Sequence, residues 1–277
     1  MSVYLRPATL TEAITGLAGP DLRVLAGGTD LYPVAQGAAL DGTVMDIAGL
    51  AELRGISAQD GGLRIGACTT WTDVMQADLP PALAALQAAA RQVGGWQIQT
   101  AGTVGGNLCN ASPAADGVPP LLVCDTLVEL AGAQGMRRMA LADFITGPRQ
   151  TALRPGEILA AVLIPEAGLA GRSVFLKLGA RAHLVISIAM VAVRIVVRDG
   201  IVAGAALAVG SASPVARRLP GVEAALLGLP AERAAAAIDA GAVAAALSPI
   251  DDIRATAGYR VQAAVTLLRR AVAGALA

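Results

Sequence analysis

The chain has 277 residues and no net formal charge, and 55% of its residues are apolar although only 3% are aromatic. That length allows one large domain or two smaller ones with a sizeable core. The charges are scattered and form no basic stripe with interleaved aromatic residues, which excludes an ordinary nucleic-acid-binding surface. The longest uncharged apolar run, residues 184–193, is about half of what a bilayer span needs.

In chain order, residues 1–10 contain no basic region followed by an apolar block, which argues against a signal peptide. We therefore expect a soluble cytoplasmic protein. Residues 3–6 predict a strand, and Thr9 with Glu12 predicts a capped helix start. Residues 22–31 predict an apolar strand that runs into Gly27-Gly28. Further strands are expected at 44–47, 63–67, 127–131 and 157–164, and a helix at 81–93.

The second part of the chain has a different residue pattern. The small, glycine-containing segment 165–171 marks a boundary between domains 1–167 and 172–277. Three apolar runs rich in β-branched residues follow at 173–178, 187–198 and 201–209, and Asp199-Gly200 predicts a hairpin turn between the last two. Helices are expected at 222–227 and 231–247 and in the amphipathic final segment from 259 to 272. The fold class is therefore α+β.

Few residues of this chain are suited to acid–base or metal chemistry. Cys68, Cys109 and Cys124 lack paired spacing and are best interpreted as small buried hydrophobic residues. His183 is the only histidine, too few for a multi-histidine metal site, and we expect it to be a packed or surface residue. We therefore predict no metal ligand and no catalytic residue on this chain.

Two glycine turns stand out, AGGTDL at 26–31 and GTVGGN at 102–107. Both follow apolar or extended segments, and Gly-Gly lets backbone N–H groups turn outward toward an anion. Thr29, Thr103 and Asn107 add polar side chains, so two such turns would suit a pyrophosphate held from both sides. Either one is equally well a tight turn at a strand end, and neither matches the Rossmann or P-loop fingerprint. The residues alone thus leave a dinucleotide or phosphate ligand of undefined class.

Five segments in order make the chain resemble one family. They are AGGTDL, GTVGGNLCNASPAADGVPPLL, LADFITGPRQTALRPGEILAAVLIP, FLKLGARAHLVISIAMVAVRI and AGYRVQAAVTLLRRAV. Together they resemble the FAD-binding (medium) subunit of molybdenum hydroxylases, the group of xanthine dehydrogenase, carbon monoxide dehydrogenase and aldehyde oxidoreductases. The resemblance implies a two-part FAD-binding domain of the vanillyl-alcohol-oxidase/PCMH type, followed by a three-stranded antiparallel sheet with helices.

The resemblance also implies a set of FAD-binding residues. In the first loop they are Leu25, Ala26, Gly27, Gly28, Thr29, Asp30 and Leu31, and in the second Thr103, Val104, Gly105, Gly106 and Asn107. Outside the loops they are Ser112, Asp116, Leu159 and Lys177.

Several of these residues have an alternative interpretation. Asp116 is also suited to capping the turn before Pro119, and Leu159 belongs to a core strand in any case. Lys177, the only lysine, is either a plain surface charge or an ammonium that stabilises the anion of a reduced flavin. Trp96 and Tyr32 lie near the loops in sequence and are suited to stacking on the cofactor, although core packing is favoured for both.

Ser187 is one departure from the family pattern. Many relatives have an acidic residue just before the Ile-Ala of the second strand of the C-terminal domain, whereas this chain has Ser187.

The resemblance implies an FAD-carrying electron-transfer subunit. A large molybdopterin subunit would hydroxylate the substrate, and two [2Fe-2S] centres on a small subunit would pass electrons to FAD. An external acceptor (NAD, a quinone or oxygen) would then take them, in a complex assembled as a dimer of heterotrimers. The alternatives are a free-standing FAD-dependent oxidoreductase of the same fold and a non-catalytic nucleotide-binding protein. The shortage of acid–base residues favours the subunit.

Overall fold

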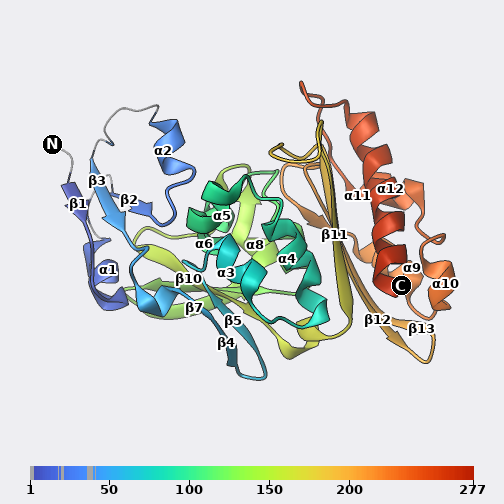
Figure 1. Ribbon diagram of the computed structural model, residues 1–277, viewed down its shortest axis with the longest axis horizontal. Helices are drawn as coiled ribbons and strands as arrows, with labels where there is room; N and C mark the ends of the chain where they lie inside the picture. Colours follow the sequence, from blue (N-terminus) through green and yellow to red (C-terminus); the bar gives the residue numbers. More distant parts are fainter. Residues whose placement is uncertain (1–2, 18, 20–21, 36–39, 41) are drawn as a thin grey trace.

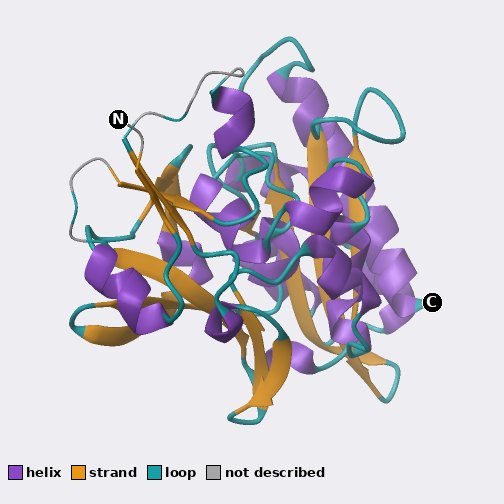
Figure 2. Ribbon diagram, turned by 60° about the vertical axis from the view of Figure 1, so that its left-hand side comes forward, coloured by secondary structure: helices purple, strands orange, loops and turns teal. Residues whose placement is uncertain are grey.

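The computed structural model describes residues 3–17, 19, 22–35, 40 and 42–277 and has a mixed helix-and-sheet fold (Figures 1 and 2). Met1 and Ser2, which begin the segment searched for a signal peptide, lie outside the described residues. Within these ranges no helix is both long enough and apolar enough to cross a membrane.

A small parallel sheet opens the chain and leads into the first glycine turn. Its strands, in the order β1-β3-β2, are β1 (Val3–Leu5), β2 (Leu22–Leu25) and β3 (Thr43–Asp46). Helix α1 (Leu10–Gly16) lies between β1 and β2 in the chain, and the Thr9 hydroxyl caps it by accepting a hydrogen bond from the Glu12 N–H, as expected. Because β2 ends at Leu25, the first glycine turn begins at the edge of this sheet and runs into α2 (Leu31–Val34).

A five-stranded antiparallel sheet follows, with short helices on one side of it (Figure 1). In the order β4-β5-β10-β6-β7, its strands are β4 (Ile56–Gln59), β5 (Gly62–Gly66), β10 (Glu157–Ile164), β6 (Leu127–Gly132) and β7 (Gly135–Ala140). The helices on that side are α3 (Trp71–Gln76), η2 (Pro81–Leu83), α4 (Ala84–Ala90), α5 (Trp96–Ala101), α6 (Val104–Asn110), α7 (Val118–Leu122), α8 (Leu141–Phe144) and η3 (Glu166–Leu169). Leu53 of η1 (Ala51–Leu53) packs instead in a separate cluster with Ile158 and Ala160 of β10. A separate two-stranded ribbon pairs β8 (Ile145–Gly147) with β9 (Gln150–Thr151). The sequence predicted β5, β6 and β10 but not β4 or β7.

The prediction for the second glycine turn was wrong in its local structure. It does not follow an extended segment, because α5 precedes it, and its two glycines lie in the first turn of α6. Thr103 is the N-cap of α6, and its hydroxyl accepts a hydrogen bond from the Gly106 N–H at 3.0 Å. The Gly-Gly pair therefore opens a helix instead of forming a tight turn.

The C-terminal part is an antiparallel sheet with helices, but the sheet has four strands and not the expected three. Its order is β11 (Arg172–Leu178), β12 (Ala189–Arg198), β13 (Ile201–Gly210) and β14 (Arg217–Arg218), and the two residues of β14 are too few to give a sequence signal. Asp199 and Gly200 have φ of 51° and 74°, which confirms the predicted hairpin turn. The helices are α9 (Pro220–Leu226), α10 (Ala231–Ala234), α11 (Ala240–Ala246) and α12 (Ala257–Leu276), so the helix expected at 231–247 is broken in two.

This second sheet is buried on both faces. Met190 and Ala192 of β12 point into the core that contains α4 and α7, whereas Val191 and Val193 point into the core under α12. Burial of both faces explains why the strand is a continuous apolar run and not an alternating one. The two parts of the chain therefore share one core, and β11 lies directly against α4 of the first part (Figure 1).

Candidate functional site

The two glycine loops meet in the wall of one large cleft of about 1140 Å³. Small-molecule sites are usually about 300–1,000 Å³, so this cleft has the size that a dinucleotide needs. Of the predicted FAD-binding residues, the cleft wall includes Leu25, Ala26, Gly27, Gly28, Thr29, Asp30, Leu31, Thr103, Gly105, Gly106, Asn107, Ser112, Asp116, Leu159 and Lys177. Val104 is the exception, because its side chain is fully buried in the main core.

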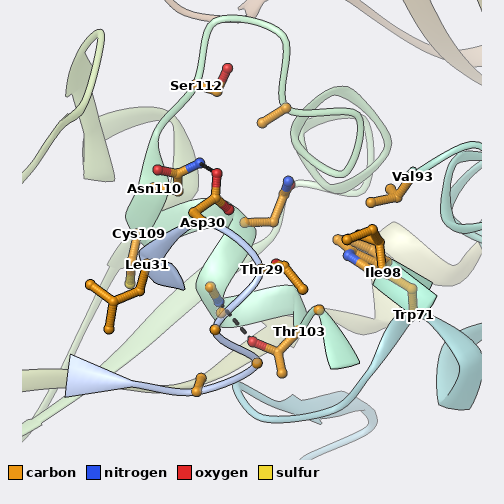
Figure 3. A pocket seen from close by; sticks show the side chains of 18 of the residues that line it. Thr29, Asp30, Leu31, Trp71, Val93, Ile98, Thr103, Cys109, Asn110 and Ser112 are labelled. Carbon is orange, nitrogen blue, oxygen red and sulfur yellow. Dashed lines mark hydrogen bonds between the residues drawn. The ribbon is translucent and has the colours of Figure 1, made fainter. Parts of the chain in front are cut away.

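Contact between the two loops depends on Gly27. A Cβ on this residue would lie 2.6 Å from the carbonyl carbon of Ala101 and 2.9 Å from the Cα of Gly102. These are backbone atoms and cannot move aside as a flexible side chain can. The missing side chain therefore brings the first loop against the backbone that leads into the second, and Figure 3 shows Thr29 and Thr103 in the same part of the cleft.

The first loop has backbone donors available. None of the described residues accepts a hydrogen bond from the N–H groups of Gly27, Gly28, Thr29 or Asp30. Gly28 has a φ of +71°, a left-handed conformation that turns the chain sharply before α2. Successive free N–H groups around such a turn form a concavity suited to an anion.

Most backbone N–H groups of the second loop donate to other atoms of the protein, whereas the sequence predicted that they turn outward toward a ligand. The Gly105 N–H donates to the Ala67 carbonyl at 2.8 Å, and the Gly106 N–H is taken by the Thr103 hydroxyl. This loop offers a ligand a side-chain acceptor instead, because Asn107 Oδ1 is buried without a hydrogen-bond partner among the described residues. A buried oxygen without a donor is costly, and Asn107 lines the cleft, so a ligand donor would satisfy it.

The cap on α6 gives a direct test of this loop. We expect Thr103→Ala to lower the free energy of unfolding by about 1 kcal/mol and to weaken cofactor binding, because the first turn of α6 forms the cleft wall. Thr256 caps α12 with the same type of hydrogen bond, to the Tyr259 N–H. Thr256→Ala is therefore the matched control, which loses similar stability in a urea melt but keeps its ligand affinity. Equal affinities in the two variants would contradict this role for α6.

Asp116 and Lys177 form a buried ion pair in the cleft wall. Lys177 Nζ lies 2.6 Å from Asp116 Oδ2 and 3.3 Å from the Gln92 carbonyl, and the Ser187 hydroxyl donates to Asp116 Oδ1 at 2.9 Å. Burial raises the pKa of Asp116, while the Lys177 charge and both hydrogen bonds oppose that rise. Asp116 is thus no turn cap and Lys177 no surface charge, and the pair joins the two parts of the chain.

A polar network connects the first loop to the end of α6. Asn110 Nδ2 donates to Asp30 Oδ1 at 2.7 Å, a bond drawn in Figure 3, and the guanidinium of Arg149 donates to the side-chain and backbone oxygens of Asn110. Arg149 has a φ of +60° and lines the cleft. The sequence did not single out Asn110 or Arg149, although both lie within segments that carry the resemblance.

Apolar residues line another side of the cleft. Trp71, Val93 and Ile98 gather there in Figure 3, and none of them was predicted. The core packing favoured for Trp96 and Tyr32 was wrong, since their side chains are 71% and 53% exposed. Leu159 is buried in β10 and lines the cleft as well.

The cleft thus offers one polar region with free backbone donors, one buried ion pair and one apolar surface. His183, the only histidine, is exposed and does not line it. Over the described part of the chain, no group of three His, Cys, Asp or Glu residues is placed to hold a metal ion.

Comparisons with known proteins agree on one family. Residues 1–167 match the family described as "FAD binding domain in molybdopterin dehydrogenase", and residues 175–275 match "CO dehydrogenase flavoprotein C-terminal domain". The xanthine dehydrogenase FAD-binding subunit of Escherichia coli O157:H7 is 42% identical over 58% of this chain and 57% of its own length. The aligned region thus covers less than two thirds of that relative.

Two further relatives match over nearly the whole chain. The nicotine 6-hydroxylase medium subunit of Paenarthrobacter nicotinovorans is 32% identical over 97% of this chain and 95% of its own. A chain of the reconstituted CO dehydrogenase from Oligotropha carboxidovorans has the same fold, with a TM-score of 0.89, 28% identity and coverage of 100% and 98%. This chain, with its FAD-binding domain, belongs to the family of FAD-binding subunits of molybdopterin dehydrogenases.

Proposed function

We propose that this chain is the FAD-carrying electron-transfer subunit of a molybdopterin-dependent hydroxylase or dehydrogenase. Electrons would arrive from [2Fe-2S] centres of a small subunit and leave to NAD, a quinone or oxygen. We assign the FAD-binding domain to residues 1–167 and the C-terminal domain to 172–277. The large molybdopterin subunit and the small subunit would join this chain in a heterotrimer, which pairs to a dimer of heterotrimers.

The residues of the cleft fit FAD. The free N–H groups from Gly27 to Asp30 suit the oxygens of a diphosphate, and the unpartnered Asn107 Oδ1 suits a ligand N–H or O–H. Glycine at 28 and 106 lets a ligand approach the backbone without meeting a Cβ. The apolar surface around Trp71 and Ile98 suits a planar ring system.

When bound, FAD supplies the redox chemistry, because it exchanges electrons one or two at a time. The residues of this chain bind and orient the cofactor, keep water from it and set the charge around it. Asp116 and Lys177 place one negative and one positive charge in the wall, so the pair adds no net charge to a buried region. The scarcity of proton-transfer groups in the cleft agrees with a role in electron transfer without substrate chemistry.

The meeting of the two glycine loops in one cleft carries this proposal. The test is purification of the chain from its native host under mild conditions. We expect a yellow protein with one FAD per chain that co-purifies with a molybdopterin chain and an iron–sulfur chain. A yellow chain that oxidises a substrate by itself would favour the free-standing oxidoreductase, and a colourless chain that takes up no added FAD would favour the non-catalytic protein.

An exposed apolar strip beside the cleft supports the proposed partners. Ile253 is fully exposed, and Arg254, the next residue in the chain, donates to the carbonyl of Ser187, which follows the exposed Ile186, at 3.0 Å. Leu184 in the same segment is exposed and lines the cleft. Exposed apolar groups gathered in this way are typical of protein–protein contacts.

We therefore expect Ile253→Glu to weaken association with the partner chains by about tenfold while FAD content stays unchanged. Met136→Glu is the matched control, since Met136 is also exposed but lies on β7 in the other sheet. Co-purification of tagged variants from the native host measures the effect. Equal recovery of partner chains with both variants would contradict a contact at this strip.

A further inference from the structure

Segment 179–187, between β11 and β12, has no regular secondary structure, yet it forms part of the cleft wall. Leu184, Val185 and Ile186 line the cleft. At the end of the segment, the Ile188 N–H donates to the Leu178 carbonyl at 2.8 Å and starts the β12 ladder. Whatever fixes this end therefore fixes one wall of the cleft.

Two arginines of the C-terminal part donate hydrogen bonds to backbone carbonyls at the end of this segment. Arg260 of α12 is completely buried, and its Nη1 donates to the carbonyls of Ile188 at 2.7 Å and of Ser211 at 2.8 Å. Arg254 Nη1 donates to the Ser187 carbonyl at 3.0 Å. The carboxylate of Asp252 lies 2.6 Å from each guanidinium and keeps both in place.

We propose that Ser187 is a positioning residue for the cleft, held by Arg254 and Arg260 so that its hydroxyl fixes the Asp116 carboxylate beside Lys177. The inference rests on the proposed function of the cleft as an FAD site. Ser187 is fully buried, and its hydroxyl donates to Asp116 Oδ1 while Lys177 takes Oδ2. Each carboxylate oxygen thus has its own donor, one from β11 just before the segment and one from the last residue of the segment.

A serine at position 187 also avoids a second negative charge beside Asp116. An acidic residue at 187 would face Asp116 with a second negative charge, and Lys177 could neutralise only one of them. The hydroxyl donates a hydrogen bond and adds no charge, so the buried pair stays neutral as a whole. Arg254 and Arg260 lie behind the Ser187–Ile188 peptide and are bound to Asp252.

The test compares Ser187→Ala with Ser173→Ala. Ser173 is also a buried serine that joins the two parts of the chain, because its hydroxyl accepts from the Ala85 N–H at 2.8 Å, but it does not contact Asp116. In the FAD-free chain, infrared absorption of the Asp116 carboxylate is followed against pH as the difference from the corresponding Asp116→Asn protein. FAD dissociation constants are measured on the same proteins.

We expect Ser187→Ala to raise the pKa of Asp116 by about one unit and to weaken FAD binding about tenfold, while Ser173→Ala changes neither. Arg254→Met leaves the hydroxyl but frees the Ser187 peptide, so it should shift both quantities in the same direction by less. Arg269→Met is its control, because Arg269 of α12 donates to the Ile238 carbonyl, outside the cleft wall.

An unchanged Asp116 pKa in Ser187→Ala, or an equal loss of FAD affinity in Ser173→Ala, would overturn the inference. If Ser187→Ala fails to fold, Arg254→Met serves as the test instead, because the Arg254 side chain is partly exposed. A wild-type chain that binds no FAD would instead remove the proposed function, and the Asp116 titration would still decide the role of Ser187.

Discussion

Replacing Gly27 by valine is expected to abolish FAD binding and to lower the free energy of unfolding by roughly 3 kcal/mol. Even the first carbon of the new side chain would lie 2.6 Å from the Ala101 carbonyl carbon, so the two loops must separate or the backbone must distort. Either change destroys the arrangement that places both loops in one cleft. FAD content after reconstitution and urea denaturation measure the two effects.

Gly258→Ala is the matched control for this substitution. Gly258 lies in the first turn of α12, where an added Cβ would meet no other atom within 4 Å, and alanine has a higher helix propensity than glycine. This variant should bind FAD normally and be as stable as wild type or more so. Full FAD occupancy in Gly27→Val would contradict the contact between the loops.

Lys177→Met is expected to cost about 3 kcal/mol of stability at pH 7 and to weaken FAD binding. The substitution leaves the Asp116 carboxylate buried without its partner at 2.6 Å. The double variant Lys177→Met/Asp116→Asn removes both charges and should be more stable than the sum of the single effects predicts. Arg172→Met, an exposed position on the same strand, should change stability by less than about 0.5 kcal/mol.

The effect of Lys177→Met should depend on pH in a defined direction. Burial raises the folded-state pKa of Asp116 above its ordinary 3.8, so its contribution to stability is greatest below that pH and declines as pH rises through the folded-state pKa. Without Lys177 the pKa rises further. The stability difference between wild type and Lys177→Met should therefore be smallest near pH 4 and grow toward neutrality. A constant difference, or additive single effects, would contradict the buried ion pair.

The ion pair also bears on the proposed role of Lys177 in stabilising the reduced flavin. The ammonium is not free to act on a flavin alone, because Asp116 offsets much of its charge. If removal of the ammonium weakens binding of the reduced cofactor tenfold more than that of the oxidised one, the two-electron potential falls by about 30 mV. An unchanged potential in Lys177→Met would leave Lys177 with a structural role only.

Much of the fold was accessible from local sequence signals. Apolar runs of sufficient length predicted β5, β6, β10 and the three long strands of the second sheet, and Asp199-Gly200 predicted the hairpin. The signals failed where strands are short or polar on one face, as in β7, whose residues are partly exposed. The sequence signals also failed where a glycine pair opens a helix, because Gly105 and Gly106 lower the helix propensity of this segment. Helix α6 is explained by the Thr103 cap and by the close packing of Gly105 on Ala67.

The residues of the candidate site could be predicted for a different reason. The loop residues and Asp116, Leu159 and Lys177 came from a resemblance that spans the chain, and the fold brings all of them except Val104 into one cleft. The partners of those residues could not be predicted, because they depend on contacts between distant segments. Ser187 lies 71 positions from Asp116 and Arg260 lies 72 positions from Ile188, and no local pattern joins them.

A crystal structure of the chain with FAD bound tests the position of the diphosphate between the two glycine loops most directly. We expect the diphosphate to lie between the two loops, with its oxygens within hydrogen-bond distance of N–H groups from Gly27 to Asp30 and beside the first turn of α6. A diphosphate bound elsewhere, with those N–H groups facing only water, would contradict it.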